Sequence, residues 1–232
     1  MRSTSLALFV LLPVLAFSAC VAIWSGTGRH ASWIGSGRPG SGVSATQTRL
    51  VPEFHALRIE GSCDAKVAIG GAASLEITAD DNLIDDLTTE VVDGVLVIAM
   101  KDGANDSFRV GPRATISVPA FDCAVIEGSG DVDVTGVNGE KFEVRISGSG
   151  DLSARGKATN VSVAIEGSGD IDLGALESQQ ASVSIDGSGD ARVRCSQSLT
   201  AAVNGSGDID YLGSPAQTHI AVSGSGDVRP VK

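Results

Sequence analysis

Basic charge and aromatic side chains are both scarce in this sequence. Its 232 residues include 17 Lys and Arg against 28 Asp and Glu, which gives a formal net charge of −11. Binding to nucleic acid and electrostatic docking on anionic lipid both need a basic face, so this charge argues against both. Aromatic residues make up only 4% of the chain. A hydrophobic core must therefore be built from Val, Ile, Leu and Ala.

The groups that usually carry catalysis are also few and scattered. No Gly-x-Ser-x-Gly motif or metal-binding helix accompanies the three histidines His30, His55 and His219. No CxxC spacing links the three cysteines beyond the N-terminal region, Cys63, Cys123 and Cys195. We therefore expect small isolated thiols rather than a disulfide framework or a zinc site.

The first 20 residues are typical of a secretory signal. Arg2 supplies a positive charge, residues 6–17 are apolar, and Ser18-Ala19-Cys20 follows. This arrangement resembles a bacterial lipobox, in which Cys20 becomes the lipidated first residue of the mature protein. An ordinary cleaved signal and an uncleaved anchor over residues 6–24 are the alternatives. In each case the rest of the chain is exported.

Two segments separate this signal from the repeats. Residues 21–49 are rich in Gly and Ser without apolar periodicity, which predicts a flexible linker. Residues 51–120 alternate in short apolar runs, which predicts an irregular β-structured part. Within it, residues 80–87 fit either one helical turn or a loop.

An internal repeat occupies the remainder. The tetrapeptide Gly-Ser-Gly-Asp begins at 128, 148, 167, 187, 205 and 224, and Gly61-Ser62-Cys63-Asp64 is a degenerate seventh copy. The intervals between the six copies are 20, 19, 20, 18 and 19 residues. Two residues before each copy stand Ile126, Ile146, Ile165, Ile185, Val203 and Val222. Each repeat is therefore predicted to be a strand, a Gly-Ser-Gly-Asp turn, a second strand and a second turn.

Stacking of the repeats explains this pattern, because a lone hairpin cannot bury its apolar face. Equivalent strands would pair in parallel at about 4.8 Å. We predict an all-β fold, a right-handed parallel β-solenoid of six to seven coils, with residues 50–232 as the folded domain. A left-handed hexapeptide helix is disfavoured by the polar residues at its expected third positions, Asn138, Glu177 and Gln197. Pro230 is expected to blunt the edge of the C-terminal coil.

The chain resembles the auto-transporter adhesin head GIN domain family of exported bacterial proteins over roughly residues 50–232. The resemblance rests on Ile59-Glu60-Gly61-Ser62, on residues 79–84 and 89–98, and on the recurring Ile-x-Gly-Ser-Gly-Asp. It implies a β-helical fold, export and, from the family name, adhesion. It implies no catalytic residues.

The aspartate of each tetrapeptide is the candidate site residue. Stacked coils would align Asp131, Asp151, Asp170, Asp190, Asp208 and Asp227 about 4.8 Å apart. Adjacent charges at that distance repel by ~1 kcal/mol in water, so something must offset the repulsion. One hypothesis is that each carboxylate accepts backbone N–H groups of its own turn or of the neighbouring coil. The alternative is calcium bound along the column, although the period differs from the nine-residue calcium-binding repeat.

Carboxylate pairs raise the question of an enzyme. Glycosidases use two acidic residues, and acidic i, i+2 pairs occur here at Asp131 and Asp133, Asp170 and Asp172, and Asp208 and Asp210. Such pairs are also common on solvated strand faces of acidic proteins, so we predict a protein without catalysis or cofactor.

The leading function is adhesion to surface glycans or envelope proteins, from the periplasm, the outer membrane or the cell surface. A structural envelope module without a specific ligand is the alternative, and calcium could stabilise either. The membrane would be met only through the N-terminal lipid or signal segment. The oligomeric state is left open.

Overall fold

Strands account for most of the chain in the computed structural model, which describes residues 37–101 and 107–232. The predicted signal, Cys20 and residues 21–36 of the predicted linker lie outside these residues. The strands are β1 (Ser44–Thr48), β2 (Ala56–Gly61), β3 (Asp64–Ile69), β4 (Ser74–Asp80), β5 (Leu87–Val92), β6 (Val95–Met100), β7 (Arg113–Val118), β8 (Cys123–Gly128), β9 (Val132–Gly148), β10 (Leu152–Gly167), β11 (Ile171–Gly187), β12 (Ala191–Gly205), β13 (Ile209–Leu212), β14 (Gln217–Gly224) and β15 (Val228–Pro230). Within the described ranges the one helix is the 3-10 turn η2 (Ile84–Asp86), so no helix there is long and apolar enough to cross a membrane.

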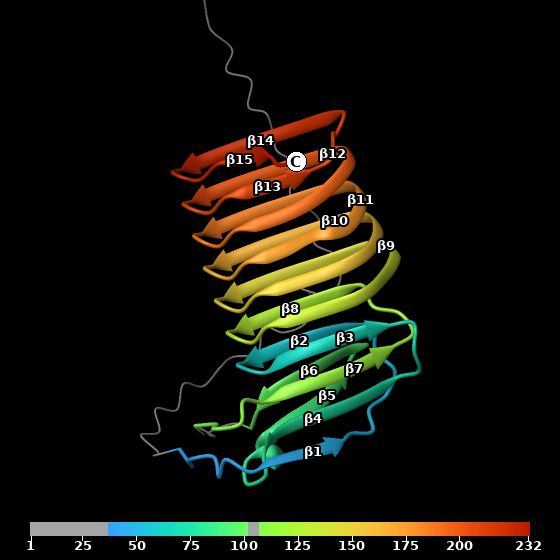
Figure 1. Cartoon of the computed structure of the whole chain (residues 1–232), viewed down its shortest axis with the longest axis vertical. Helices are drawn as coiled ribbons and strands as arrows, with labels where there is room; N and C mark the ends of the chain where they lie inside the picture. The colour runs from blue at the N-terminus through green and yellow to red at the C-terminus, as the bar shows by residue number, and fades with distance from the viewer. Residues whose placement is uncertain (1–36, 102–106) are drawn as a thin grey trace, which may run out of the picture. The chain divides into compact units, whose positions relative to one another are not determined.

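The repeats form stacked parallel coils, as predicted (Figure 1). Each of β9, β10, β11 and β12 runs from one Gly-Ser-Gly-Asp corner to the next and is paired in parallel with its neighbours. In the C-terminal coil this path is divided between β13 and β14. The six corners delimit a solenoid of about five turns. The degenerate seventh corner stacks beneath them, because Gly61 pairs with Gly128.

The predicted apolar columns form the core. Ile146 pairs with Ile165, which pairs with Ile185 and through it with Val203, and each of these side chains is at most 2% exposed. Parallel in-register pairing places identical positions above one another, so a single apolar residue per coil builds a continuous dry column.

The second turn of each coil, which we call the second bend, does not follow the six-residue register of a hexapeptide helix. Asn138, Glu177 and Gln197 are exposed, as their polarity suggests. The inward positions of this bend are instead Val137, Ala158, Leu176 and Cys195. The bend is therefore apolar inside, but Val137, Leu176 and Cys195 precede the positions that a strict six-residue spacing selects, whereas Ala158 lies at such a position, six residues after Leu152.

An excursion of the chain builds the base of the stack. After β3 the chain leaves the coil and returns only at β8, which lies on β2. Within the excursion, β6 pairs in parallel with β2, and β7 pairs in parallel with β3. β5 and β4 then add antiparallel to β6 and β7. The predicted irregular β-structured part is this base, and its ambiguous segment after Asp80 forms a turn followed by η2.

The linker prediction is wrong for residues 44–48. These residues form β1, which pairs antiparallel with β4 over its whole length. Glycine and serine content predicted a flexible chain, but an edge strand needs only its backbone groups to pair. Arg49 follows the strand directly, and its guanidinium group donates hydrogen bonds to the carbonyl oxygens of Leu87 and Ile84, which helps to hold β1 in place.

Candidate functional site

The Gly-Ser-Gly-Asp corners stack in one column along the side of the solenoid. In every corner the serine N–H donates to the carbonyl oxygen of the first glycine one coil below, at 2.8–2.9 Å. The backbone of one corner therefore lies directly on the backbone of the next. At Gly167, φ is +133° and a Cβ atom would stand 2.3 Å from the carbonyl oxygen of Gly148. Only glycine fits this position.

The aspartates form a ladder of hydrogen bonds. The N–H of Asp151 donates to Oδ1 of Asp131, and the pattern continues up to Asp227, whose N–H donates to Oδ1 of Asp208 at 2.8 Å. Each carboxylate below Asp227 thus accepts the backbone N–H of the aspartate one coil above it. This confirms the hypothesis that the carboxylates accept N–H groups of the neighbouring coil. The degenerate copy extends the ladder by one step, because Oδ1 of Asp64 accepts the N–H of Asp131.

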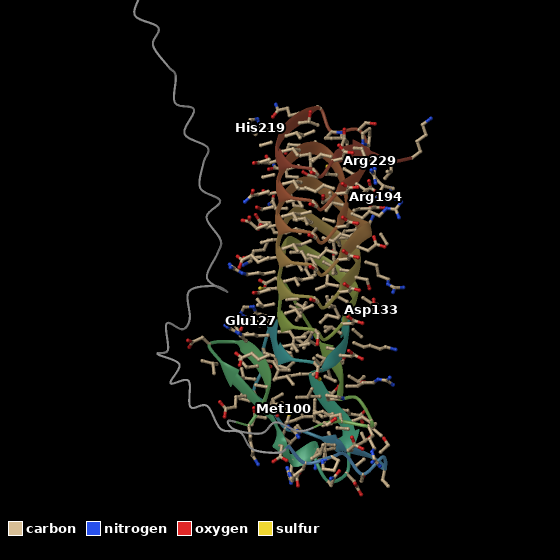
Figure 2. The ribbon with its side chains drawn as sticks, turned by 90° about the vertical axis from the view of Figure 1, so that its left-hand side faces the viewer. Met100, Glu127, Asp133, Arg194, His219 and Arg229 are labelled. Atoms are coloured by element: carbon tan, nitrogen blue, oxygen red, sulfur yellow. The ribbon has the colours of Figure 1, made fainter. Side chains whose placement is uncertain are left out.

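Basic residues beside the ladder offset part of its charge. Arg229 lies 3.2 Å from Asp208 and 2.9 Å from Asp210, and these two carboxylates raise the pKa of its guanidinium. Ser153, which donates to Asp133 at 2.8 Å, and the guanidinium of Arg155 hold the pKa of Asp133 below its usual range. Figure 2 shows Asp133, Arg194 and Arg229 on one side of the stack, with Glu127 and His219 on the other.

Two shallow grooves run along the ladder and share Asp170 and Asp172. Their volumes are about 370 and 200 Å³. The predicted i, i+2 carboxylate pairs line them, with Asp131 and Asp133 in the first groove and Asp208 and Asp210 in the second. In the part of the chain that the structure describes, no group of three or more His, Cys, Asp or Glu side chains is arranged to hold a metal ion. The acidic residues are occupied with backbone N–H groups and basic neighbours.

Calcium is therefore expected to leave the protein's stability unchanged. The melting temperature in millimolar calcium should equal that in chelator, because the ladder aspartates already have backbone partners. Scanning calorimetry in the two buffers measures the difference. A rise of several degrees with calcium would show that the ladder binds it.

Substitutions at Asp170 are expected to separate the hydrogen bond from the charge. Asp170 Oδ1 accepts the N–H of Asp190 at 2.8 Å. Asp170→Ala removes this acceptor and should cost about 1 kcal/mol, or roughly 3 °C in melting temperature. Asp170→Asn keeps an acceptor oxygen and removes one charge from the column, so its melting temperature at low salt should equal or exceed that of the wild type. If both variants lost the same stability, the carboxylate's charge rather than its acceptor oxygen would hold the coils.

A third groove lies on the outside of the second bend. It has a volume of about 530 Å³ and crosses β9, β10, β11 and β12. Lys157 and Glu177, 3.0 Å apart, form an exposed ion pair on its surface. Polar donors and acceptors surround them, and the main ones are Asn138, Thr159, Gln179, Arg194 and Ser196. Sequence analysis did not single out this groove, because its residues are not repeated identically.

Glu143 is a second feature that sequence analysis missed. It lies on the outward side of β9, yet it is only 6% exposed, and its Oε1 atom has no hydrogen-bond partner. Burial raises the pKa of this carboxyl, and the nearby charge of Asp122 raises it further against the opposing effect of Lys141. Outward strand parity predicted a solvated side chain. Glu143 pairs with Cys123 of β8, which is itself only 1% exposed.

Glu143→Gln is expected to stabilise the protein at neutral pH. Because the pKa is raised in the folded state, Glu143 favours folding below the unfolded pKa of about 4.3, and this contribution is lost as pH rises through the folded pKa. The variant should melt a few degrees above the wild type at pH 7 and show no such gain at pH 4. The matched control is Glu140→Gln, at an exposed position of the same strand. An equal gain at both pH values would contradict the role of ionisation.

Among residues 37–101 and 107–232, thiols and imidazoles do not come together. Cys63, Cys123 and Cys195 are buried thiols, and burial raises the pKa of Cys63 to about 12. His55 pairs with Asp122 at the base, whereas His219 lies on β14 at the other end of the stack. His30 lies outside the described residues.

The geometry defines a class of protein: a rigid all-β solenoid with polar outer columns and shallow grooves. The chain belongs to the family described as "Putative auto-transporter adhesin, head GIN domain", whose profile matches residues 53–126 and 115–215. This confirms the resemblance derived from the sequence. The family name places the protein among exported or surface proteins and supports an adhesin role.

Solved structures agree with this assignment. A "putative adhesin" from Bacteroides fragilis NCTC 9343 is 25% identical, with a TM-score of 0.70, and the match covers 84% of this chain and 100% of that chain. A "putative adhesin" from Parabacteroides merdae ATCC 43184 shares the fold at 22% identity and a TM-score of 0.59, over 84% and 98% of the two chains. A "putative lipid binding protein" from Parabacteroides distasonis ATCC 8503 shares it at 24% identity and a TM-score of 0.56, over 85% and 100%. A search of curated proteins gave no match.

Proposed function

We propose that this protein is a non-catalytic adhesin that binds extended polar ligands, such as surface glycans, along the groove of the second bend. The observation that carries the proposal is the groove itself. It crosses four successive strands, so donors and acceptors recur at the coil spacing of about 4.8 Å. A chain of sugar residues offers hydroxyl groups repeatedly along its length and can contact several coils at once.

The composition of the groove suits weak multivalent binding. Lys157 and Glu177 are 72% and 64% exposed, so they form a flat polar surface rather than a closed pocket. No Phe, Tyr or Trp lies among the groove's lining residues, which removes the stacking platform that gives many lectins their affinity. Affinity would therefore come from the number of coils engaged and from many copies on one surface.

Binding of the full chain, purified in mild detergent, to glycan arrays and to whole cells tests this function. Lys157→Ala combined with Gln179→Ala should abolish binding and leave the melting temperature unchanged, because both side chains are exposed. The matched control, Ser153→Ala with Arg192→Ala, alters the two grooves along the aspartate ladder and should bind like the wild type. Absence of wild-type binding to any surface would favour the structural envelope module instead.

We also propose that Cys20 carries a lipid that anchors the head domain at the bacterial envelope. The Ser18-Ala19-Cys20 sequence after an apolar segment supports this. Metabolic labelling with a fatty-acid analogue should modify the wild type and not Cys20→Ala. Surface labelling of cells that produce the wild type or Cys20→Ala reports whether the anchored protein faces outward. Equal fatty-acid labelling of both would exclude Cys20 as the lipidated residue.

A further inference from the structure

The apolar core is open at the C-terminal end of the stack. Ile220 and Val222 of β14 are each 44% exposed, although they stand in register with Ala201 and Val203, which are 1% and 2% exposed. At the opposite end Leu75 of β4 and Leu96 of β6 are fully buried, and β1 and β5 pair antiparallel with these two strands. Figure 1 shows β14 and β15 at one end of the stack, and the base with β1 and β4 at the other.

Only half of the open end is protected against pairing. On β15, Pro230 has no N–H to donate, and Arg229 is engaged with Asp208 and Asp210. This agrees with the expectation that Pro230 blunts the edge. β14 has neither a proline nor an ion-paired arginine. Its sequence, Gln-Thr-His-Ile-Ala-Val-Ser-Gly, contains no proline, lysine or other fixed charge, and an unprotected edge of this kind is ready to pair with another strand.

We propose that β14 pairs antiparallel with β14 of a second copy of this chain, so that two solenoids join end to end through their C-terminal coils. Charge favours a second copy at this edge. Two chains of net charge −11 repel each other, and residues 217–224 contain no carboxylate, so the copies meet where repulsion is weakest.

The edge is also complementary to itself. A two-fold axis through Ala221 places Ile220 of one copy opposite Val222 of the other, on the inner side of a continuous sheet. Both side chains then enter a core that runs through the two stacks. The two-fold contact uses the same C-terminal edge of both copies, so this contact closes at a pair and does not itself continue into a filament.

The proposed dimer is expected to be weak and reversible. Pairing of a single coil edge would bury less than a standard interface of about 1,600 Å², so we expect association only at concentrations on the order of 100 μM. Attachment of both copies to one membrane would raise their effective concentration and favour the pair.

Sedimentation equilibrium of the full chain in density-matched detergent tests the proposal. The wild type should double in mass with rising concentration, and Ile220→Lys combined with Val222→Lys should remain monomeric. The matched control is Val92→Lys, which alters an equally exposed apolar residue of the base, 44% exposed, and should dimerise like the wild type. A wild type that stays monomeric throughout would overturn the proposal, as would a dimer that survives the double substitution.

Disulfide trapping locates the interface independently. Ala221→Cys places two thiols opposite each other across the two-fold axis, within reach of a disulfide, and should give a covalent dimer on mild oxidation. Ala202→Cys, one coil below in the same column, should give no more dimer than the wild type. Equal trapping of the two variants would show that the copies meet elsewhere.

Discussion

Gly167→Ala is expected to lower the melting temperature by roughly 10 °C or more. The residue has φ of +133°, and an added Cβ would stand 2.3 Å from the carbonyl oxygen of Gly148. That oxygen also accepts the N–H of Ser168 at 2.9 Å, so the coils cannot separate without losing this hydrogen bond. Backbone strain and overpacking each cost about 1–3 kcal/mol, which together make ~4 kcal/mol.

The matched control lies in the same solenoid. Gly139→Ala adds a Cβ whose nearest neighbour is the carbonyl oxygen of Lys141 at 3.6 Å, and its φ is not in the left-handed region. Its melting temperature should stay within a few degrees of the wild type, since alanine also restricts the unfolded chain. Thermal unfolding followed by circular dichroism compares the two. Equal melting of both variants would mean that the corners tolerate a side chain and do not set the coil spacing.

The solenoid could be predicted from the sequence because its repeat couples local and long-range structure. A Gly-Ser-Gly-Asp corner fixes where each strand begins, and its recurrence fixes which residues lie above one another. The sequence alone therefore assigns Ile146 and Ile165 to one core column. The aspartate ladder followed from the same register, because stacked carboxylates need a partner that repeats with them.

The base and the outer surface could not be predicted in this way. β1 pairs with β4 across some 30 residues, and nothing in its Ser-Ala-Thr-Gln-Thr sequence indicates that partner. Glu143 has the strand parity of an exposed residue, and its burial depends on what neighbours it in space. The groove of the second bend combines residues from four strands that share no motif. Each of these features depends on contacts between segments whose spacing is not repeated.

Asp80 shows how much of the base depends on one such contact. This fully buried carboxylate accepts three backbone N–H groups, from Gly42 at 2.6 Å and from Arg109 and Val110 at 2.8 and 3.0 Å. Burial alone would raise its pKa, but these three hydrogen bonds and the charge of Arg109 outweigh it and hold the pKa below the usual range. One side chain thus joins the end of β4 to the segment before β1 and to the segment before β7.

Asp80→Asn is therefore expected to lower the melting temperature at pH 7 by on the order of 10 °C. The new amide NH₂ group would face N–H donors, and at least one of them would lose its acceptor inside the protein. Circular dichroism at pH 7 measures the loss, and Asp81→Asn, at the adjacent exposed position, should change the melting temperature little.

The pH dependence of the melting temperatures of the wild type and Asp80→Asn tests whether ionisation of Asp80 is the cause of the loss. A carboxyl whose pKa is lowered on folding stabilises the protein above its unfolded pKa of about 3.9, and this stability is lost as pH falls through the folded value. The gap between wild type and Asp80→Asn should therefore be widest above pH 5 and close as the pH falls below 4. A gap that stays constant down to pH 2 would show that the substitution acts through packing and not through the charge that holds the base together.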